Sequence, residues 1–398
     1  MHPGRVLSST RTTAVDGGGP VSVSLSVPVD SRLAEPAVYG TVGVVTPTES
    51  VMAQSAAPLP RRPALAPGRT VLWRAPDCVQ LGLDGPHAMV LDGLTAPMAA
   101  LLRAMDGSRD TAHLVAEAVT AGGDRAEVLA VITELHRAGL VRDEPAPNRC
   151  ERTALEIDLA AGSAHSGRPA AELVRVRRSA SVLVHGSGRV AVALAVALAA
   201  AGIGRVVVAA EGTVRASDVG TGYLLSDVGR GRNDAARDAL RRAAPGVRTE
   251  AAGARSSPHL VAVTDAVVPD PGLALDLVVR RRPHLAVYAH ESVAVVGPLV
   301  SPGRSSCLRC VELRRADVDP AWPKLAAQLA VTAPNAGLAC TQLAAALAAE
   351  QALAALAGPD AGNRPPIWGA TLELDPVRGV LHRRSWPIHP RCGCGALR

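Results

Sequence analysis

The chain of 398 residues is long enough for two or three domains, each with its own hydrophobic core. Apolar residues make up 48% of it and charged residues 20%, which indicates a globular protein, and a formal charge of only +6 argues against nucleic acid as the partner. Lysine occurs once among the 42 basic residues, so chemistry that needs a lysine against a phosphate or in a Schiff base would depend on Lys324 or on an arginine substitute.

The apolar runs and the cysteines indicate the compartment. The run 189–203 is too short to cross a bilayer, and the run 336–357 carries Gln342, Glu350 and Gln351. Seven cysteines without a preceding secretory signal predict a reducing environment with a metal site rather than a set of disulfides. We therefore expect a cytoplasmic protein with no membrane partner.

Residues 1–60 are rich in Ser, Thr, Val, Gly and Pro without lasting periodicity, which predicts disorder. Met52 lies just before the first segment with a clear pattern and is a plausible alternative start. The residues before Met52 would then result from a misassigned start codon.

Residues 61–145 are predicted to form a winged-helix module. Three strand-like runs, TVLWRAP, VQLGLD and HAMVLDG, begin at Thr70 and are separated by turns rich in Pro, Asp and Gly. Gly139 is expected to end the last helix of the module. The helices and the return strand are expected at residues 95–104, 110–119, 124–137 and 140–141.

The charge of this module favours a peptide over DNA as its ligand. Nine arginines stand against eleven acids in residues 61–145, and Asp124, Glu127 and Glu134 make the last helix a poor surface for phosphates. An extended peptide could instead add to the exposed strand edge and pack against that helix, although a purely structural or dimerising module is the alternative. VQLGLD, VLDGL, LLRAMDGSRD and ELHRAGLV together resemble the PqqD-like element that binds the leader of a precursor peptide in ribosomal-peptide biosynthesis.

A linker is expected at residues 146–175, followed by an α/β domain at residues 176–398 with a Rossmann-like start. A short apolar strand, a glycine turn and an alanine-rich helix stand in SVLVHGSGRVAVALAVALAAAGIGRVVVAAE, with Gly186, Gly188 and Ala191 at the small positions of a G-x-G-x-x-G/A pattern. Glycine lets the backbone approach a phosphate, which would lie at the positive end of the helix.

The order of the following segments resembles the ThiF and ubiquitin-activating-enzyme family over about residues 175–398. These segments are a V-x-x-S-D run, the turn S-D-V-G-R-G-R, a basic helix, and VTD at 263–265. The resemblance implies ATP and magnesium as cofactors and adenylation of a carboxylate at a protein C-terminus. The cofactor-binding residues that it implies are Gly186, Gly188, Glu211, Arg230, Arg232 and Asp265.

Several positions depart from the family pattern. The aspartate that the family places on the ATP ribose corresponds to Ala210, and Glu211 could replace it only with a shifted carboxylate. Where the family has an asparagine, an arginine and two lysines, this chain has in the same order Asp218, Thr221, Arg230 and Arg232. One surviving acid, Asp265, and two arginines are too few for adenylation, so a degenerate domain without catalytic residues is expected; if it is active, Asp265, Arg230 and Arg232 would act on the triphosphate.

Four cysteines in two close pairs predict a structural zinc site. Cys307-x-x-Cys310 and Cys392-x-Cys394 each present two thiolates on a tight turn, and four thiolates leave no open position for catalysis. His389 is an outside candidate for one of the four positions.

The segment VGPLVSPGRSSCLRCVELRRADVDPAWPKLAAQL is similar to ThiF-like partner proteins of YcaO-type azoline cyclodehydratases. The resemblance implies a leader-binding scaffold, and because the chain ends four residues after Cys394 we expect the YcaO protein to be a separate polypeptide. We also expect a homodimer. The alternatives are an active ThiF-type adenylyltransferase, an NAD-dependent oxidoreductase with Glu211 on the ribose, and a regulatory winged-helix protein.

Overall fold

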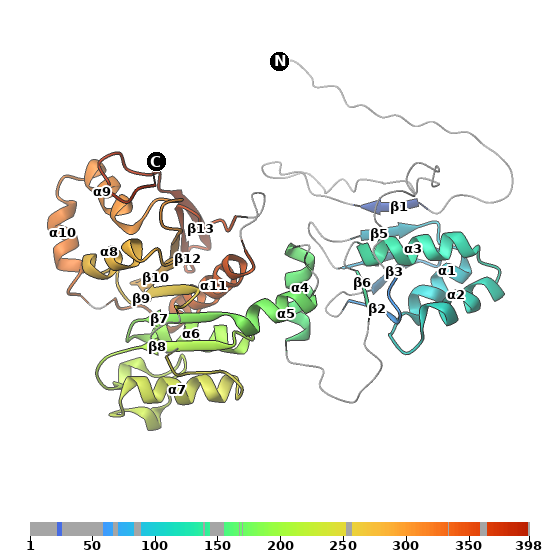
Figure 1. Ribbon diagram of the computed structural model, residues 1–398, viewed down its shortest axis with the longest axis horizontal. Helices are drawn as coiled ribbons and strands as arrows, with labels where there is room; N and C mark the ends of the chain where they lie inside the picture. Colours follow the sequence, from blue (N-terminus) through green and yellow to red (C-terminus); the bar gives the residue numbers. More distant parts are fainter. Residues whose placement is uncertain are drawn as a thin grey trace, which may run out of the picture. The chain divides into compact units, whose positions relative to one another are not determined.

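The computed structural model forms two compact units, residues 1–167 and residues 168–398 (Figure 1). Each unit is described by itself. The structure describes residues 22–25, 59–66, 71–82, 89–137, 140–143, 155–166, 168, 170–251, 257–332, 334–358 and 364–396. Met52, Gly139 and Cys150 lie outside these residues, as does most of the segment 1–60.

A seven-stranded mixed sheet forms the centre of the second unit, in the order β13-β12-β11-β10-β9-β7-β8. The four strands from β8 to β10 run parallel to their neighbours, and the three that follow are antiparallel. The strands are β7 (Ser181–His185), β8 (Arg205–Ala209), β9 (Leu260–Thr264), β10 (His284–His290), β11 (Val293–Val300), β12 (Ala370–Asp375) and β13 (Val380–Ser385). This mixed α/β architecture confirms the expected Rossmann-like class.

Helices cover both faces of this sheet. Along β7, Val182 and Val184 join the large core that contains α6 and α11, whereas Leu183 packs with Leu277 of α8 on the other side. The period of two along a strand produces this division. The helices are α5 (Ala170–Ser179), α6 (Arg189–Ala200), α7 (Arg232–Ala243), α8 (Pro271–Val279), α9 (Leu308–Val318), α10 (Trp322–Leu329) and α11 (Leu338–Leu356), with short 3₁₀ turns η2 (Ala216–Asp218) and η3 (Leu225–Asp227).

Helix α11 is long and apolar enough to span a membrane by length and composition alone. It instead packs against α6, β10 and β11, and its side chains Ala344, Ala348 and Ala352 are buried in the core. The small alanine side chains let the helix approach its neighbours closely. We therefore regard α11 as a core helix.

The described part of the first unit contains six strands and four helices, and the expected run of strands, three helices and a return strand corresponds to β3 to β6 with α1 to α3. Its four-stranded sheet has the order β1-β5-β4-β3, and β2 pairs with β6. The elements are β1 (Ser22–Leu25), β2 (Pro63–Leu65), β3 (Val71–Ala75), β4 (Cys78–Leu81), β5 (Met89–Asp92), α1 (Ala96–Ala104), α2 (Thr111–Thr120), α3 (Arg125–Arg137), β6 (Val141–Asp143) and α4 (Glu156–Ser166).

Local sequence signals explain these helices. The Asp110 carboxylate accepts a hydrogen bond from His113 N at 2.8 Å, and the Asp124 carboxylate accepts from Ala126 N at 2.9 Å, so each aspartate caps the helix that it precedes. The apolar faces of the three helices meet around the fully buried Ile132. The expected linker region contains α4 and α5, which belong to different units.

Candidate functional site: the glycine turn and the cysteine cluster

The glycine turn between β7 and α6 is shaped by the end of β9. Gly186 has a φ of +155°, and a Cβ there would lie 2.0 Å from Thr264 Oγ1. A Cβ on Gly188 would lie 2.6 Å from Asp265 Oδ1. Both positions therefore require glycine because of protein atoms that are already present, whether or not a phosphate binds.

The carboxylate of Asp265 lies against the first turn of α6. Its Oδ2 accepts hydrogen bonds from Gly188 N and from Thr264 Oγ1, each at 2.9 Å. Burial raises the pKa of the Asp265 carboxyl, while the N–H groups of Gly188, Ala191 and Val190 oppose this rise. The site that the sequence predicts for a phosphate thus holds an acid of the chain itself.

The end of β8 lies beside the same turn. Glu211 N donates to Ser187 Oγ at 2.9 Å, which places the exposed Glu211 next to the glycine turn. Ala210 is buried, and its N–H donates to Asn233 Oδ1 at 2.9 Å. The hydrogen bond of its backbone N–H therefore places Glu211 beside the turn. Its carboxylate is carried one residue beyond the buried Ala210, the position that the family pattern assigns to an aspartate.

Arg232 and Asp218 form a shielded ion pair. Arg232 Nη2 lies 2.7 Å from Asp218 Oδ2, and the two side chains are only 14% and 13% exposed. Arg232 Nη1 also donates to the carbonyl of Glu211 at 3.0 Å. The guanidinium is thus held near the turn, but its charge is already matched by a carboxylate.

Arg230 is engaged elsewhere. Its Nη1 lies 2.5 Å from Asp227 Oδ1, and its Nη2 lies 2.7 Å from Asp238 Oδ2. These hydrogen bonds raise the pKa of the Arg230 guanidinium, with the bond to Asp238 as the main cause. Neither of these bonds connects Arg230 to the glycine turn.

Arg189, the first residue of α6, is the cation that sequence reasoning missed. It directly follows Gly188, it makes no ion pair with any described residue, and its buried Nε has no hydrogen-bond partner. The sequence signal that could have identified Arg189 is its position inside the G-x-G-x-x-G/A pattern, directly after Gly188. Among the described residues, Arg189 is a cation at the turn for which no ion pair forms.

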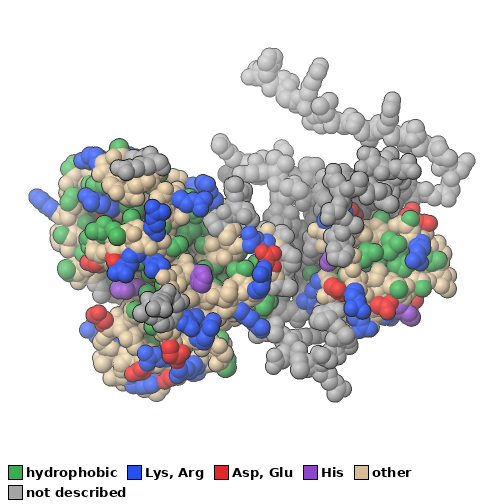
Figure 2. Space-filling view, viewed as in Figure 1, with side chains coloured by type: hydrophobic (Ala, Val, Ile, Leu, Met, Phe, Trp, Pro, Cys, Tyr) green, Lys and Arg blue, Asp and Glu red, His purple; other side chains and the backbone are tan. Residues whose placement is uncertain are grey.

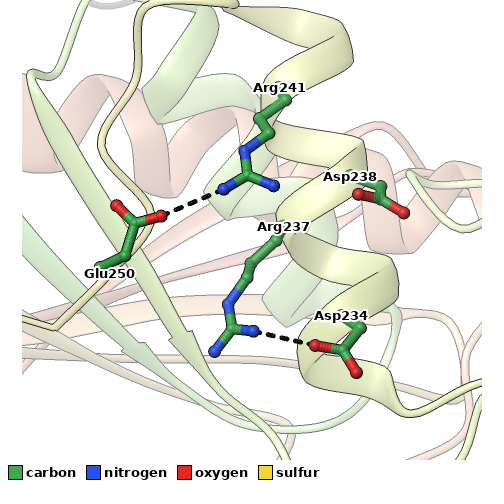
Figure 3. A pocket seen from close by; sticks show the side chains of 5 residues that line it. All are labelled: Asp234, Arg237, Asp238, Arg241 and Glu250. Atoms are coloured by element: carbon green, nitrogen blue, oxygen red, sulfur yellow. Dashed lines mark hydrogen bonds and ion pairs between the residues drawn. The ribbon is translucent and has the colours of Figure 1, made fainter.

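Several charged side chains elsewhere on the second unit form ion pairs with one another. Arginines are scattered over its visible face with acids among them (Figure 2). A hollow on α7 is lined by Asp234, Arg237, Asp238, Arg241 and Glu250 (Figure 3). There Arg237 pairs with Asp234 at 2.8 Å and Arg241 with Glu250 at 3.0 Å, so the hollow is an open, charge-compensated surface.

The four predicted cysteines come together in space. Cys307 Sγ lies 3.6 Å from Cys392 Sγ, and Cys310 Sγ lies 3.8 Å from both Cys307 Sγ and Cys394 Sγ. All four sulfurs are within 4.8 Å of one another. Tetrahedral zinc with Zn–S bonds of about 2.3 Å needs sulfurs about 3.8 Å apart, so the donor set fits this metal.

The surroundings of the cluster favour a structural role. Cys307 precedes α9, and Cys310 lies in its first turn, so one helix start presents both sulfurs. A hydrogen bond from Cys307 lowers the pKa of Cys310 to about 4, which makes Cys310 the first of the two to ionise. With four sulfurs as ligands, a bound zinc would tie α9 to the segment after β13 and leave no position for substrate.

His389 takes another role. Its Nε2 lies 2.9 Å from Asp317 Oδ2, and its Nδ1 accepts from Arg391 N at 3.1 Å. Both ring nitrogens are therefore used, and His389 supports the loop that carries Cys392. Cys340, which lies apart from the cluster on α11, is 4% exposed and packs as a small apolar side chain.

Comparison with known proteins gives the family. A model of the ThiF family matches residues 167–396, which include the glycine turn, Asp265 and the cysteine cluster. The chain belongs to the ThiF family. This confirms the resemblance seen in the sequence and supports the ThiF alternatives over the oxidoreductase. No curated protein matches the chain by sequence.

Solved structures of two proteins have a fold similar to that of this ThiF family member. A crystal structure of E. coli MccB aligns with a TM-score of 0.60 at 13% identity, over 84% of this chain and 97% of that chain. MccB with ATP aligns with a TM-score of 0.62 at 13% identity, over 83% and 99%. The heterocyclase TruD aligns with a TM-score of 0.56 at 18% identity, over 85% of this chain and 43% of that chain. The likeness of fold extends beyond the residues that the family model matches.

Proposed function

We propose that this chain binds the leader segment of a ribosomally made precursor peptide and presents the peptide to a separate YcaO-type cyclodehydratase. In this proposal the ThiF domain is a scaffold that does not adenylate. The observation that carries it is that the charged residues assigned to ATP already have protein partners: the Asp265 carboxylate accepts a hydrogen bond from Gly188 N at the start of α6, and Arg230 and Arg232 are bound to carboxylates. A triphosphate would have to displace each of these partners.

The module at 61–145 is the proposed peptide site, a PqqD-like winged helix. Its sheet offers a strand edge to an extended segment, and α3 offers the half-buried Leu129 beside its core face. MccB has been crystallised with MccA, in one case together with AMPCPP, which supports a peptide partner for a chain of similar fold. We place a homodimer with structural zinc in the cytoplasm.

Binding of the neighbouring precursor tests this proposal. A short peptide encoded beside the gene, labelled with fluorescein, should bind the full chain in an anisotropy titration. Leu129→Glu should weaken binding about tenfold or more, because it puts a charge against the apolar contact of the peptide. Val119→Glu makes the same change at an exposed apolar residue of α2 and should leave binding unchanged. If no encoded peptide binds, the proposal fails.

A working adenylyltransferase is the second candidate, favoured by Arg189 and by the structure of MccB with ATP. It predicts ATP–pyrophosphate exchange dependent on magnesium and on a peptide substrate. Arg189→Ala should then lower exchange at least tenfold, whereas Arg237→Ala, whose guanidinium is paired with the exposed Asp234 on α7, should not. Robust exchange would refute the scaffold role.

A further inference from the structure

The outer edge of the four-stranded sheet in the first unit is covered by a segment from far earlier in the chain. Strand β1 lies beyond β5 at this edge and pairs with it antiparallel along its whole length (Figure 1). Ser22 is opposite Asp92, and Leu25 is opposite Met89. An extended segment of the chain therefore already adds a strand to this sheet.

The sequence around β1 suits such a strand. Apolar residues alternate with serines in VSVSLSV (21–27), which is the pattern of a strand with one apolar face. The apolar positions are Val21, Val23, Leu25 and Val27. The paired part is only four residues long and must close a loop from residue 25 to residue 89. Because the pairing is short and joins segments that are far apart in the sequence, another strand can replace β1 on β5.

Strand β5 is well placed to accept an extended peptide. Two successive side chains, Val90 and Leu91, are only 8% and 1% exposed, so both faces of the strand are covered. Its backbone N–H and C=O groups on the outer side are what a partner can pair with. Main-chain pairing of this kind supplies affinity for extended peptides with little demand on their sequence.

We propose that residues 22–25 are a built-in occupant of the peptide-binding edge on β5, which the precursor peptide must displace. This inference rests on the proposed function and adds a regulation to it. A peptide that binds only when the edge is free has its apparent affinity reduced by the fraction of time that the edge is free. If that fraction is about one tenth, release of β1 tightens binding about tenfold.

A synthetic fluorescent peptide of residues 20–30 is the probe, titrated into the full chain. In an antiparallel pair only alternate residues point their N–H toward the partner, so one of Val23→Pro and Ser24→Pro removes a bond to β5. At least one of the two variants should bind the probe about tenfold more tightly than the unmodified chain. Ser8→Pro, the same kind of change outside the strand, should bind like the unmodified chain.

Hydrogen exchange of the full chain gives a second readout that needs no probe. Those amides of residues 89–92 that point toward β1 should lose protection in the variant that binds more tightly and keep it in Ser8→Pro, whereas the alternate amides that point toward β4 should stay protected in all variants. Equal probe affinity in all four proteins overturns the inference. So does self-association of the proline variants without tighter binding, since β1 would then only shield the edge from other chains.

The precursor peptide separates this inference from the proposed function. If the precursor binds the unmodified chain and both proline variants equally, only the inference fails. If the precursor binds none of them although β5 loses protection, the proposed function fails, and with it the role assigned to β1.

Discussion

The cysteine cluster and the glycine turn lie in the same domain, yet their polar groups are arranged in opposite ways. At the cluster the four sulfurs face one another at distances that suit a metal. At and near the turn, the acid and the two arginines that the family pattern assigns to ATP each have a protein partner, with Arg230 bound to acids away from the turn itself. Residues of types that bind ligands therefore indicate a binding site only when their polar groups are not already paired with other groups of the protein.

The largest effect is expected at the cluster. Cys310→Ser should lose the metal and lower the unfolding free energy of the ThiF unit by about 5 kcal/mol or more, a fall in Tm of roughly 10–20 °C. Metal content by mass spectrometry and a thermal melt measure both. Cys78→Ser, which changes a cysteine of the first unit, should keep one zinc per chain. If Cys310→Ser lacks the metal but keeps the Tm of the unmodified chain, the contrast between the cluster and the glycine turn is lost.

An intermediate effect is expected at the ion pair beside the turn. Arg232→Ala leaves the shielded Asp218 carboxylate without its partner and should cost about 3 kcal/mol in urea unfolding. Arg237→Ala breaks a pair with Asp234 whose two side chains are 47% and 67% exposed, and it should change stability little. If the two variants have equal stability, the turn is not held by the Arg232 pair.

The smallest effect is a pH dependence at Asp265. Because burial raises its pKa, the folded chain keeps a proton that the unfolded chain has lost, so its contribution to stability falls as pH rises above about 4. Asp265→Asn cannot ionise, so its stability relative to the unmodified chain should increase from acid to neutral pH. A relative stability that falls with pH would mean that the ionised carboxylate stabilises the turn.

Much of the fold could be predicted from local signals. The caps at Asp110 and Asp124, the strands of the module and the start of the ThiF domain follow from patterns within a few residues. The cysteine pairs were equally visible, because metal ligands keep a short spacing in the sequence. These features need no knowledge of how distant segments meet.

The features that the sequence could not predict depend on contacts between segments that are distant in the chain. Gly186 and Gly188 are explained by the approach of Thr264 and Asp265, which lie more than 70 residues later in the sequence. The pairing of Arg232 with Asp218 likewise depends on tertiary structure, whereas the family resemblance had implied that Arg232 binds the cofactor. Residues 22–25 were expected to be disordered, and a short alternation carried the only sign of β1.

A zinc held by the four cysteines would also act as a cross-link. It would close a loop from Cys310 to Cys392 that contains α10, α11, β12 and the fully exposed edge strand β13. Closing a loop of this length in the unfolded chain is worth about 4 kcal/mol by the chain-entropy model of cross-links. The edge of the large sheet would then be fastened at both ends, so β13 could not peel away without opening the metal site first.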